Sequence, residues 1–199
     1  MVNVTINGRS VQAAKDATIL DVAQQAGFPI PTLCYFKELN EIGACRICVV
    51  EVEGYERLVP ACETIVEDGM VINTNSPRVL KARRSNLQLI LSEHNTNCTT
   101  CVRTGNCKLQ TLARDFDLSE QPYVVKPERN RAEKALPYHR DADKCIKCMR
   151  CVQVCDKIQS LHIWDVVGSG SRVTVGVSGG RKLAESDCVF CGQCVTHCP

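Results

Sequence analysis

Cysteine is the residue that most constrains how this chain folds, because 15 of its 199 residues are cysteine. The count is odd, and the first residues lack the basic and then apolar pattern of a secretory signal. Both features disfavour a secreted domain held together by disulfides. Thiols that remain reduced in a cytoplasm are typically metal-binding or catalytic. We therefore expect a cytoplasmic protein whose cysteines bind metal.

The first group of cysteines lies in the first third of the chain. Cys34, Cys45, Cys48 and Cys62 form the pattern C-x10-C-x2-C-x13-C, so that one long loop would carry three ligands and a more distant cysteine would complete the site. This set is typical of a [2Fe-2S] cluster related to the plant type, in which the first gap is shorter. A zinc knuckle is the alternative interpretation of Cys45 and Cys48 taken alone.

The residues around this group predict a small sheet with one helix. Polar and apolar residues alternate over residues 2–6, and Asn7-Gly8 is a favoured hairpin turn. Thr18 is a good N-cap for a helix that would end at Gly27. Further strands are expected over residues 10–13, 47–52 and 70–72. Together these elements predict a β-grasp arrangement.

The middle third is predicted to be helical over residues 77 to about 93, with an apolar stripe that ends at His94. A lone histidine in this place would pack at the core edge or cap the helix. Here it begins the pattern H-x3-C-x2-C-x5-C with Cys98, Cys101 and Cys107. The three thiolates alone would leave a [4Fe-4S] cluster one protein ligand short.

The last third carries one cysteine pattern twice. The run C-x2-C-x2-C-x3-C occurs at Cys145, Cys148, Cys151 and Cys155, and again at Cys188, Cys191, Cys194 and Cys198. In two-cluster ferredoxins the fourth cysteine of each run binds the other cluster. The expected ligand sets are therefore Cys145, Cys148, Cys151 and Cys198 for one [4Fe-4S] cluster, and Cys155, Cys188, Cys191 and Cys194 for the other.

Two features depart from a compact two-cluster ferredoxin. Asp156 stands where proline usually follows the fourth cysteine, and 32 residues separate the two runs. This insert predicts a β-hairpin over residues 161–167 and 172–177, in which Trp164 packs. Its glycine-rich turn lacks the G-x-G-x-x-G pattern and does not begin a helix, so the turn is not expected to bind a nucleotide.

Charge and hydropathy argue against other classes of protein. A net charge of +2 predicts no polyanionic partner, and an aromatic content of 5% leaves little for base stacking, so we expect no nucleic acid. No apolar run approaches the roughly 18 residues of a membrane helix, so we expect no direct membrane insertion. The basic residues Arg78, Lys81, Arg83 and Arg84 form either a solvated face or a docking surface for an acidic partner.

The order of these motifs resembles the N-terminal iron-sulfur relay region of modular [FeFe]-hydrogenases, including NAD(P)-linked and electron-bifurcating forms. It is also similar to parts of the electron-input subunit of complex I, of NAD-dependent formate dehydrogenases and of the small diaphorase subunit of NAD-reducing hydrogenases. The resemblance implies that His94 is the fourth ligand of the cluster on Cys98, Cys101 and Cys107. The expected cofactors are then one [2Fe-2S] and three [4Fe-4S] clusters.

We therefore predict an α+β chain with three cluster-bearing parts. They are a β-grasp [2Fe-2S] domain over residues 1–76, a helical [4Fe-4S] segment over 77–126 and, after a linker over 127–137, a two-cluster ferredoxin-like domain over 138–199. Every cysteine is assigned to a cluster, and the sequence has no flavin or nicotinamide fingerprint. We expect no catalytic residue in these 199 residues.

The predicted function is an electron relay within an NAD(P)H-linked oxidoreductase, with an [FeFe]-hydrogenase favoured over a formate dehydrogenase or a diaphorase subunit. The resemblance implies three partners: a flavin- and NAD(P)H-binding diaphorase-type subunit, a small [2Fe-2S] subunit, and a catalytic domain or subunit beyond Pro199. A structural or sensing iron-sulfur protein is the alternative from another class, and a multi-zinc module is a third. Four clusters would hold about 14 iron atoms per chain, with zinc near zero.

Overall fold

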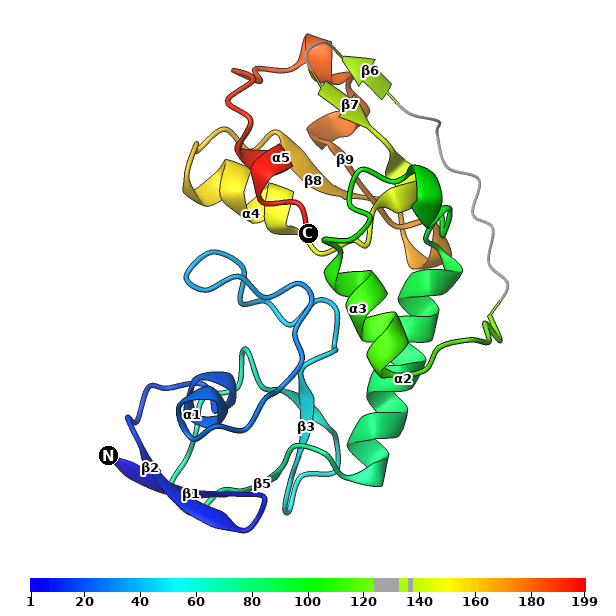
Figure 1. Ribbon diagram of the computed structural model, residues 1–199. Coiled ribbons are helices and arrows are strands. Elements are labelled where there is room, and N and C mark those ends of the chain that lie inside the picture. Colours follow the sequence, from blue (N-terminus) through cyan, green and yellow to red (C-terminus); the bar gives the residue numbers. More distant parts are fainter. Residues whose placement is uncertain (124–132, 136–137) are drawn as a thin grey trace. The chain divides into compact units, whose positions relative to one another are not determined.

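A computed structural model of the chain describes residues 1–123, 133–135 and 138–199. The chain forms two compact units (Figure 1). Unit 1 comprises Met1–Tyr35, Glu41–Leu87 and Leu109–Leu118, and unit 2 comprises Phe36–Asn40, Gln88–Lys108 and Ser119–Pro199. Most of the predicted linker over 127–137 lies outside the described residues.

A five-stranded sheet forms the centre of unit 1. Its strands are β1 (Val2–Ile6), β2 (Arg9–Ala13), β3 (Val49–Val52), β4 (Val59–Pro60) and β5 (Val71–Asn73). They lie in the order β2-β1-β5-β3-β4, with β5 parallel to β1 and antiparallel to β3. The predicted hairpin is confirmed, since β1 and β2 pair with Val4 opposite Val11 and are joined by Asn7-Gly8. The short strand β4 was not predicted.

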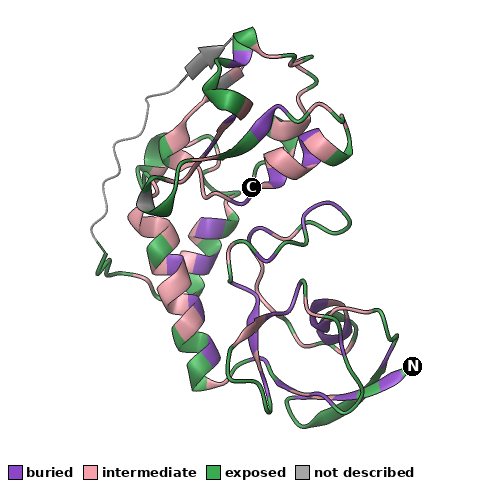
Figure 2. Ribbon diagram, turned by 180° about the vertical axis from the view of Figure 1, so that it is seen from behind, coloured by how far each residue is buried: buried purple, intermediate pink, exposed green. Residues whose placement is uncertain are grey.

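Helix α1 (Ile19–Gln25) contributes four of the sixteen buried residues in the core of unit 1. Thr18 caps it as predicted, because its hydroxyl accepts a hydrogen bond from the Asp21 N–H at 3.2 Å. Figure 2 shows buried positions gathered on α1 and the strands, where apolar side chains from both layers form one cluster. The hairpin, helix and later strands of the predicted β-grasp arrangement are thus all present in one unit.

Helix α2 (Pro77–Ser92) confirms the helix predicted from residue 77. Two features explain why α2 begins at residue 77. Proline is favoured at the first helical position, and the Ser76 hydroxyl accepts a hydrogen bond from the Val79 N–H at 3.3 Å. The short helix α3 (Lys108–Asp115) was not predicted. Arg84 joins α2 to the residues after α3 by donating to the carbonyl oxygens of Phe116 and Asp117 at 2.7 and 3.1 Å.

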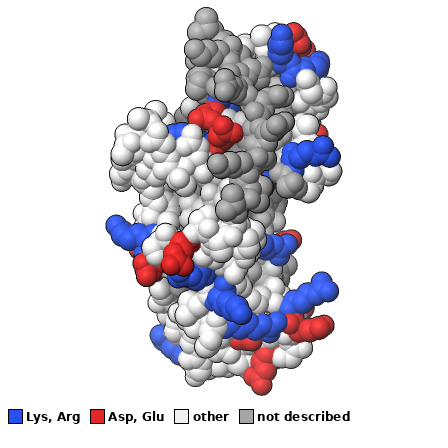
Figure 3. Space-filling view, turned by 90° about the vertical axis from the view of Figure 1, so that its right-hand side faces the viewer, with Lys and Arg blue, Asp and Glu red and all other residues white. Residues whose placement is uncertain are grey.

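Neither interpretation of the basic residues of α2 fits all four of them. Arg78 is exposed and pairs with Glu51 at 3.2 Å, and Arg84 is engaged as above, but Arg83 is only 1% exposed. A solvated basic face is therefore wrong for Arg83. On the face of the molecule drawn in Figure 3, basic and acidic side chains are interspersed rather than gathered in one basic field.

Unit 2 is built from short elements around the cysteine runs. Its helices are α4 (Arg150–Lys157) and α5 (Gln193–Thr196), and its strands are β6 (Glu133–Ala135), β7 (Tyr138–Arg140), β8 (Trp164–Val167) and β9 (Thr174–Val177). Five 3-10 turns connect them: Cys98–Thr100, Ala142–Lys144, Gly170–Arg172, Ser178–Gly180 and Leu183–Glu185. The predicted hairpin in the insert is confirmed, because β8 and β9 pair antiparallel with Trp164 opposite Val177.

Within the described part of the chain, no helix is both long enough and apolar enough to cross a membrane.

Candidate metal centres

Unit 1 brings Cys34, Cys45, Cys48 and Cys62 together as two adjacent pairs. The Sγ atoms of Cys48 and Cys62 are 3.3 Å apart. The Cys34 and Cys45 backbones each donate to the other residue's Sγ at 3.4 Å. The charge of Cys48 contributes to the raised pKa of Cys34, so the two pairs are neighbours. Three of the thiols are buried and Cys45 is half-buried.

Hydrogen bonds within the two pairs make the thiols unequal. They lower the pKa of Cys45 to about 6 and also lower the pKa of Cys48. The same bonds raise the pKa of Cys34 and Cys62, since one proton is shared within each pair. Four thiolates this close together, three of them buried, repel one another unless a positively charged group lies among them. This donor set fits an iron-sulfur cluster.

Gly43 allows the backbone to approach the second pair closely. Its φ is +59°, which favours glycine, and a Cβ atom there would lie 2.7 Å from Glu63 Oε2 and 3.2 Å from Pro60 Cβ. The Gly43 N–H donates a hydrogen bond to Cys62, which favours the thiolate. A side chain at this position would therefore push the loop away from the sulfur atom.

The predicted His94 site lies in the segment between α2 and α3. His94 follows the end of α2, Cys98 begins a 3-10 turn, and Cys107 directly precedes α3. All four predicted ligands belong to unit 2 and are half-buried, whereas Val102 between them is 99% exposed. The segment is tied to the first cysteine run by a hydrogen bond from the Asn95 N–H to the Asp143 carbonyl at 2.7 Å.

The two cysteine runs of unit 2 share one turn geometry. The N–H of Lys147 donates to Cys145 Sγ at 3.4 Å, and the N–H of Phe190, at the same place in the second run, donates to Cys188 Sγ at 3.4 Å. Both donors have positive φ, as do the equivalent residues Met149 and Gly192. The sequence repeat is therefore also a structural repeat that points backbone N–H groups at sulfur.

Electrostatic neighbours in unit 2 follow the crossed pattern expected from two-cluster ferredoxins. Burial raises the pKa of Cys151 to about 12, with further contributions from Cys148, Cys145 and Cys198 and the smallest from Cys194 of the other run. Burial likewise raises the pKa of Cys194, where the contributing thiols are Cys188, Cys191 and Cys155. Each run thus lies beside the fourth cysteine of the other run. Helix α4 carries both Cys151 and Cys155, one turn apart.

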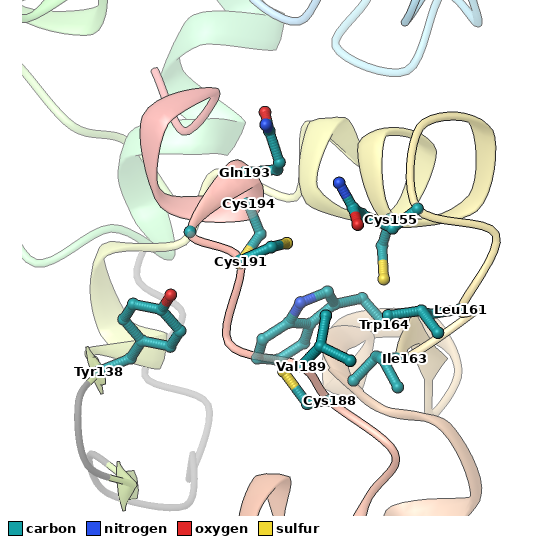
Figure 4. A pocket seen from close by; sticks show the side chains of 12 residues that line it. Tyr138, Cys155, Leu161, Ile163, Trp164, Cys188, Val189, Cys191, Gln193 and Cys194 are labelled. Atoms are coloured by element: carbon teal, nitrogen blue, oxygen red, sulfur yellow. The ribbon is translucent and has the colours of Figure 1, made fainter.

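Across the described residues, no three Cys, His, Asp or Glu side chains converge closely enough to hold a single metal ion. Thiols of the second run, together with Cys155 of the first, instead line a pocket. Figure 4 shows a pocket lined by Cys155, Cys188, Cys191 and Cys194, with the indole of Trp164 among them. Cavities of this kind suit a multinuclear group better than one ion.

Sequence reasoning treated Trp164 as hairpin packing and missed its place at this pocket. Trp164 is buried, and its indole N–H donates a hydrogen bond to Cys194, which favours the thiolate. The guanidinium of Arg140 lies over the ring, 5.3 Å from its centroid. The only available signal was that the single tryptophan of the chain lies in the insert between the two runs.

Sequence reasoning also missed a second set of contacts within unit 2. The short segment Phe36–Asn40 packs on α4 and on the residues just before this helix. The side-chain amide of Asn40 donates a hydrogen bond to the Cys148 carbonyl at 2.9 Å. The ammonium of Lys157 donates one to the Leu39 carbonyl at 2.8 Å. The ring of Phe36 lies 5.4 Å from the Arg150 guanidinium. These contacts hold α4 at both ends, at Arg150 where the helix begins and at Lys157 where it ends.

Comparison with known protein families defines the class of this chain. Residues 1–77 match the family described as "2Fe-2S iron-sulfur cluster binding domain", residues 83–122 match "NADH-ubiquinone oxidoreductase-G iron-sulfur binding region", and residues 144–199 match "4Fe-4S dicluster domain". These matches indicate one 2Fe-2S domain followed by 4Fe-4S-binding domains.

Individual relatives narrow this class. Over its whole length the chain is 42% identical to the NADP-reducing hydrogenase subunit HndD of Solidesulfovibrio fructosivorans, covering 35% of that protein. It is 37% identical, again over its whole length, to the NADH-ubiquinone oxidoreductase 75 kDa subunit of Reclinomonas americana, covering 28% of that protein. The chain thus spans about a third of the length of these curated relatives.

A solved structure agrees with the sequence relatives. The chain resembles a crystal structure of an NAD+-reducing [NiFe]-hydrogenase in the H2-reduced state, with a TM-score of 0.84, 26% identity, and coverage of 94% of this chain and 80% of the other. The protein is related to NAD(P)-linked hydrogenases and to NADH-ubiquinone oxidoreductase, as the order of the cysteine motifs predicted.

Proposed function

We propose that this chain relays single electrons within a multi-subunit oxidoreductase linked to NAD(P)H. The observation that carries the proposal is the place of Cys151 and Cys155 on α4, one helical turn apart, because each belongs to a different proposed set of four thiols. Clusters held one helical turn apart on a common helix are close enough to exchange electrons directly. A purely structural role would not require two such sites on one helix.

The proposed cofactors are one [2Fe-2S] cluster and three [4Fe-4S] clusters. The proposed ligand sets are Cys34, Cys45, Cys48 and Cys62 for the [2Fe-2S] cluster; His94, Cys98, Cys101 and Cys107 for the first [4Fe-4S] cluster; Cys145, Cys148, Cys151 and Cys198 for the second; and Cys155, Cys188, Cys191 and Cys194 for the third. Each cluster, when bound, supplies one-electron redox chemistry.

The residues around these sites hold the thiolates in place. Backbone N–H groups of Gly43, Lys147 and Phe190 point at sulfur, and such bonds favour a negatively charged site. Rigid turns with positive φ keep those donors in place whichever charge the site carries. In this proposal the chain binds the clusters and supplies fixed dipoles, and none of its residues is catalytic.

The names of the relatives support the wider assignment. A subunit of an NADP-reducing hydrogenase and a chain of an NAD+-reducing hydrogenase resemble it across almost its whole length. We infer a hydrogenase complex, of the [FeFe] type as the motif order implies, with a formate dehydrogenase as the alternative. The inferred partners are a flavin- and NAD(P)H-binding subunit, a small [2Fe-2S] subunit, and a catalytic domain or subunit.

Metal analysis and a redox titration of the anaerobically purified protein test the relay. We expect about 14 iron atoms per chain with zinc near zero, and reversible one-electron reduction of each cluster followed by EPR spectroscopy. Mostly zinc, or clusters that do not cycle reversibly, would contradict the proposal.

The assignment of His94 has its own test. In His94→Cys we expect a [4Fe-4S] cluster that is retained at a lower potential, because a thiolate adds negative charge where imidazole is neutral. In His94→Ala we expect the loss of about four iron atoms per chain. The neighbouring variant Asn95→Ala serves as the control. An unchanged potential in His94→Cys would exclude His94 as a ligand.

A further inference from the structure

The largest fully buried side chain of unit 1 is a charged one, Arg83. It lies on the inner stripe of α2 between Val79 and Leu87, both 0% exposed, and is itself 1% exposed. Its Nη2 donates to the Val49 carbonyl at 2.8 Å, and its Nη1 donates to Asn75 Oδ1 at 3.3 Å. An apolar residue would ordinarily occupy this stripe position.

Arg83 lacks a conventional counter-charge. Among the residues that the structure describes, no carboxylate lies within ion-pair distance of its guanidinium, and its buried Nε has no hydrogen-bond partner. An isolated buried cation is strongly destabilising unless a negative group compensates it. Burial lowers the pKa of Arg83 to about 10, so that the side chain is still charged at neutral pH.

A negative charge that acts on Arg83 comes from the candidate metal site of the same unit. The carbonyl that accepts from Arg83 belongs to Val49, the residue after Cys48. Cys48 is 1% exposed, lies 3.3 Å from Cys62 between their Sγ atoms, and is the thiol whose charge acts on Arg83. The buried cation of Arg83 and the thiol group of Cys48 therefore belong to neighbouring residues in the interior of unit 1.

We infer that Arg83 is the buried counter-charge of the Cys34, Cys45, Cys48 and Cys62 site and raises the reduction potential of the [2Fe-2S] cluster held there. This inference rests on the proposed ligand set. Four thiolates give the loaded site a net negative charge, and one added electron makes it more negative. A fixed cation in a poorly hydrated interior stabilises the reduced state more than the oxidised state.

The test is an EPR-monitored redox titration of the [2Fe-2S] signal in the intact protein. In Arg83→Met we expect the ratio of reduced to oxidised cluster, measured at the wild-type midpoint, to fall about tenfold, which corresponds to about 59 mV for one electron. Arg83→Lys retains the charge and should stay closer to the wild type. Arg84→Met is the matched control, because Arg84 is the next residue on α2 and donates to carbonyl groups away from the cysteines.

A second variant keeps the test decisive if Arg83→Met does not fold. Asn75 is exposed, and its Oδ1 accepts from Arg83. Asn75→Asp therefore places a carboxylate against the guanidinium and should also lower the potential. A [2Fe-2S] signal whose potential is unchanged in Asn75→Asp and in any folded Arg83→Met protein would overturn this inference alone. A wild-type protein without a [2Fe-2S] signal would overturn the proposed ligand set as well.

Discussion

The two units hold their cysteines in different ways. Among the described residues, unit 1 buries sixteen side chains in one cluster across the sheet and α1, and only Cys48 and Cys62 of these are cysteines. The corresponding cluster of unit 2 has six buried members, and its partly buried margin is rich in cysteines. Unit 1 therefore has a hydrophobic core beside its metal site. Unit 2 has a smaller core, and we expect the proposed clusters to supply much of its stability.

Removal of the clusters is the strongest test of this difference. After anaerobic chelation of iron, we expect backbone amides of α4, β8 and β9 to lose nearly all protection from hydrogen exchange, because small metal domains fold with their metal. Amides of β1, β3 and β5 should remain protected by the apolar core. Equal loss of protection in both units would refute the contrast.

Truncating one buried isoleucine in each unit gives the next largest effect. Ile72 of β5 is 0% exposed, and Ile72→Ala should destabilise unit 1 by about 2–5 kcal/mol. Ile163 before β8 is 4% exposed, and Ile163→Ala should cost about 2 kcal/mol or less while the clusters are bound. Hydrogen exchange of the loaded protein in increasing urea measures both values. A larger loss for Ile163→Ala would reverse the comparison.

A single hydrogen bond to sulfur should be visible in the potential of one cluster of unit 2. Trp164→Phe removes the indole donor to Cys194 and keeps an aromatic ring in the pocket. We expect the potential of the nearest cluster to fall by tens of millivolts, where about 59 mV is a tenfold effect. Tyr138→Phe is the control, since the Tyr138 hydroxyl donates to the Phe190 carbonyl and not to sulfur. Equal shifts in both variants would remove the special role of Trp164.

The smallest predicted effect concerns the helix of unit 1. Thr18→Ala removes the cap of α1 and should lower the free energy of unfolding of unit 1 by about 1 kcal/mol. Thr18→Ser keeps the hydroxyl and should recover most of the loss. Thermal unfolding followed by circular dichroism reports the difference, and cluster potentials should not change. A shift in the [2Fe-2S] potential would mean that α1 supports the metal site directly.

Local signals in the sequence predicted much of the fold. The first hairpin, the capped helix α1, the helix from residue 77 and the hairpin of the insert are all confirmed, because turn residues, caps and periodicity act over a few residues. The two-residue strand β4 and the short helix α3 were missed. Strand β4 is too short to show a clear period, and long-range contacts decide whether it forms. Helix α3 is one residue longer than α1, and the apolar spacing of its buried Leu109 and Leu112 was the signal that was overlooked.

By itself the sequence determined the kinds of cofactor-binding domain in this protein, because the cysteine spacings predicted 2Fe-2S and 4Fe-4S domains and the family comparisons agree. Only the tertiary structure decided what surrounds the thiols. Arg83 lies 35 residues from Cys48, and Trp164 lies 30 residues from Cys194. A buried cation on an apolar stripe and an indole donor at sulfur arise from packing between distant segments, which no local pattern encodes.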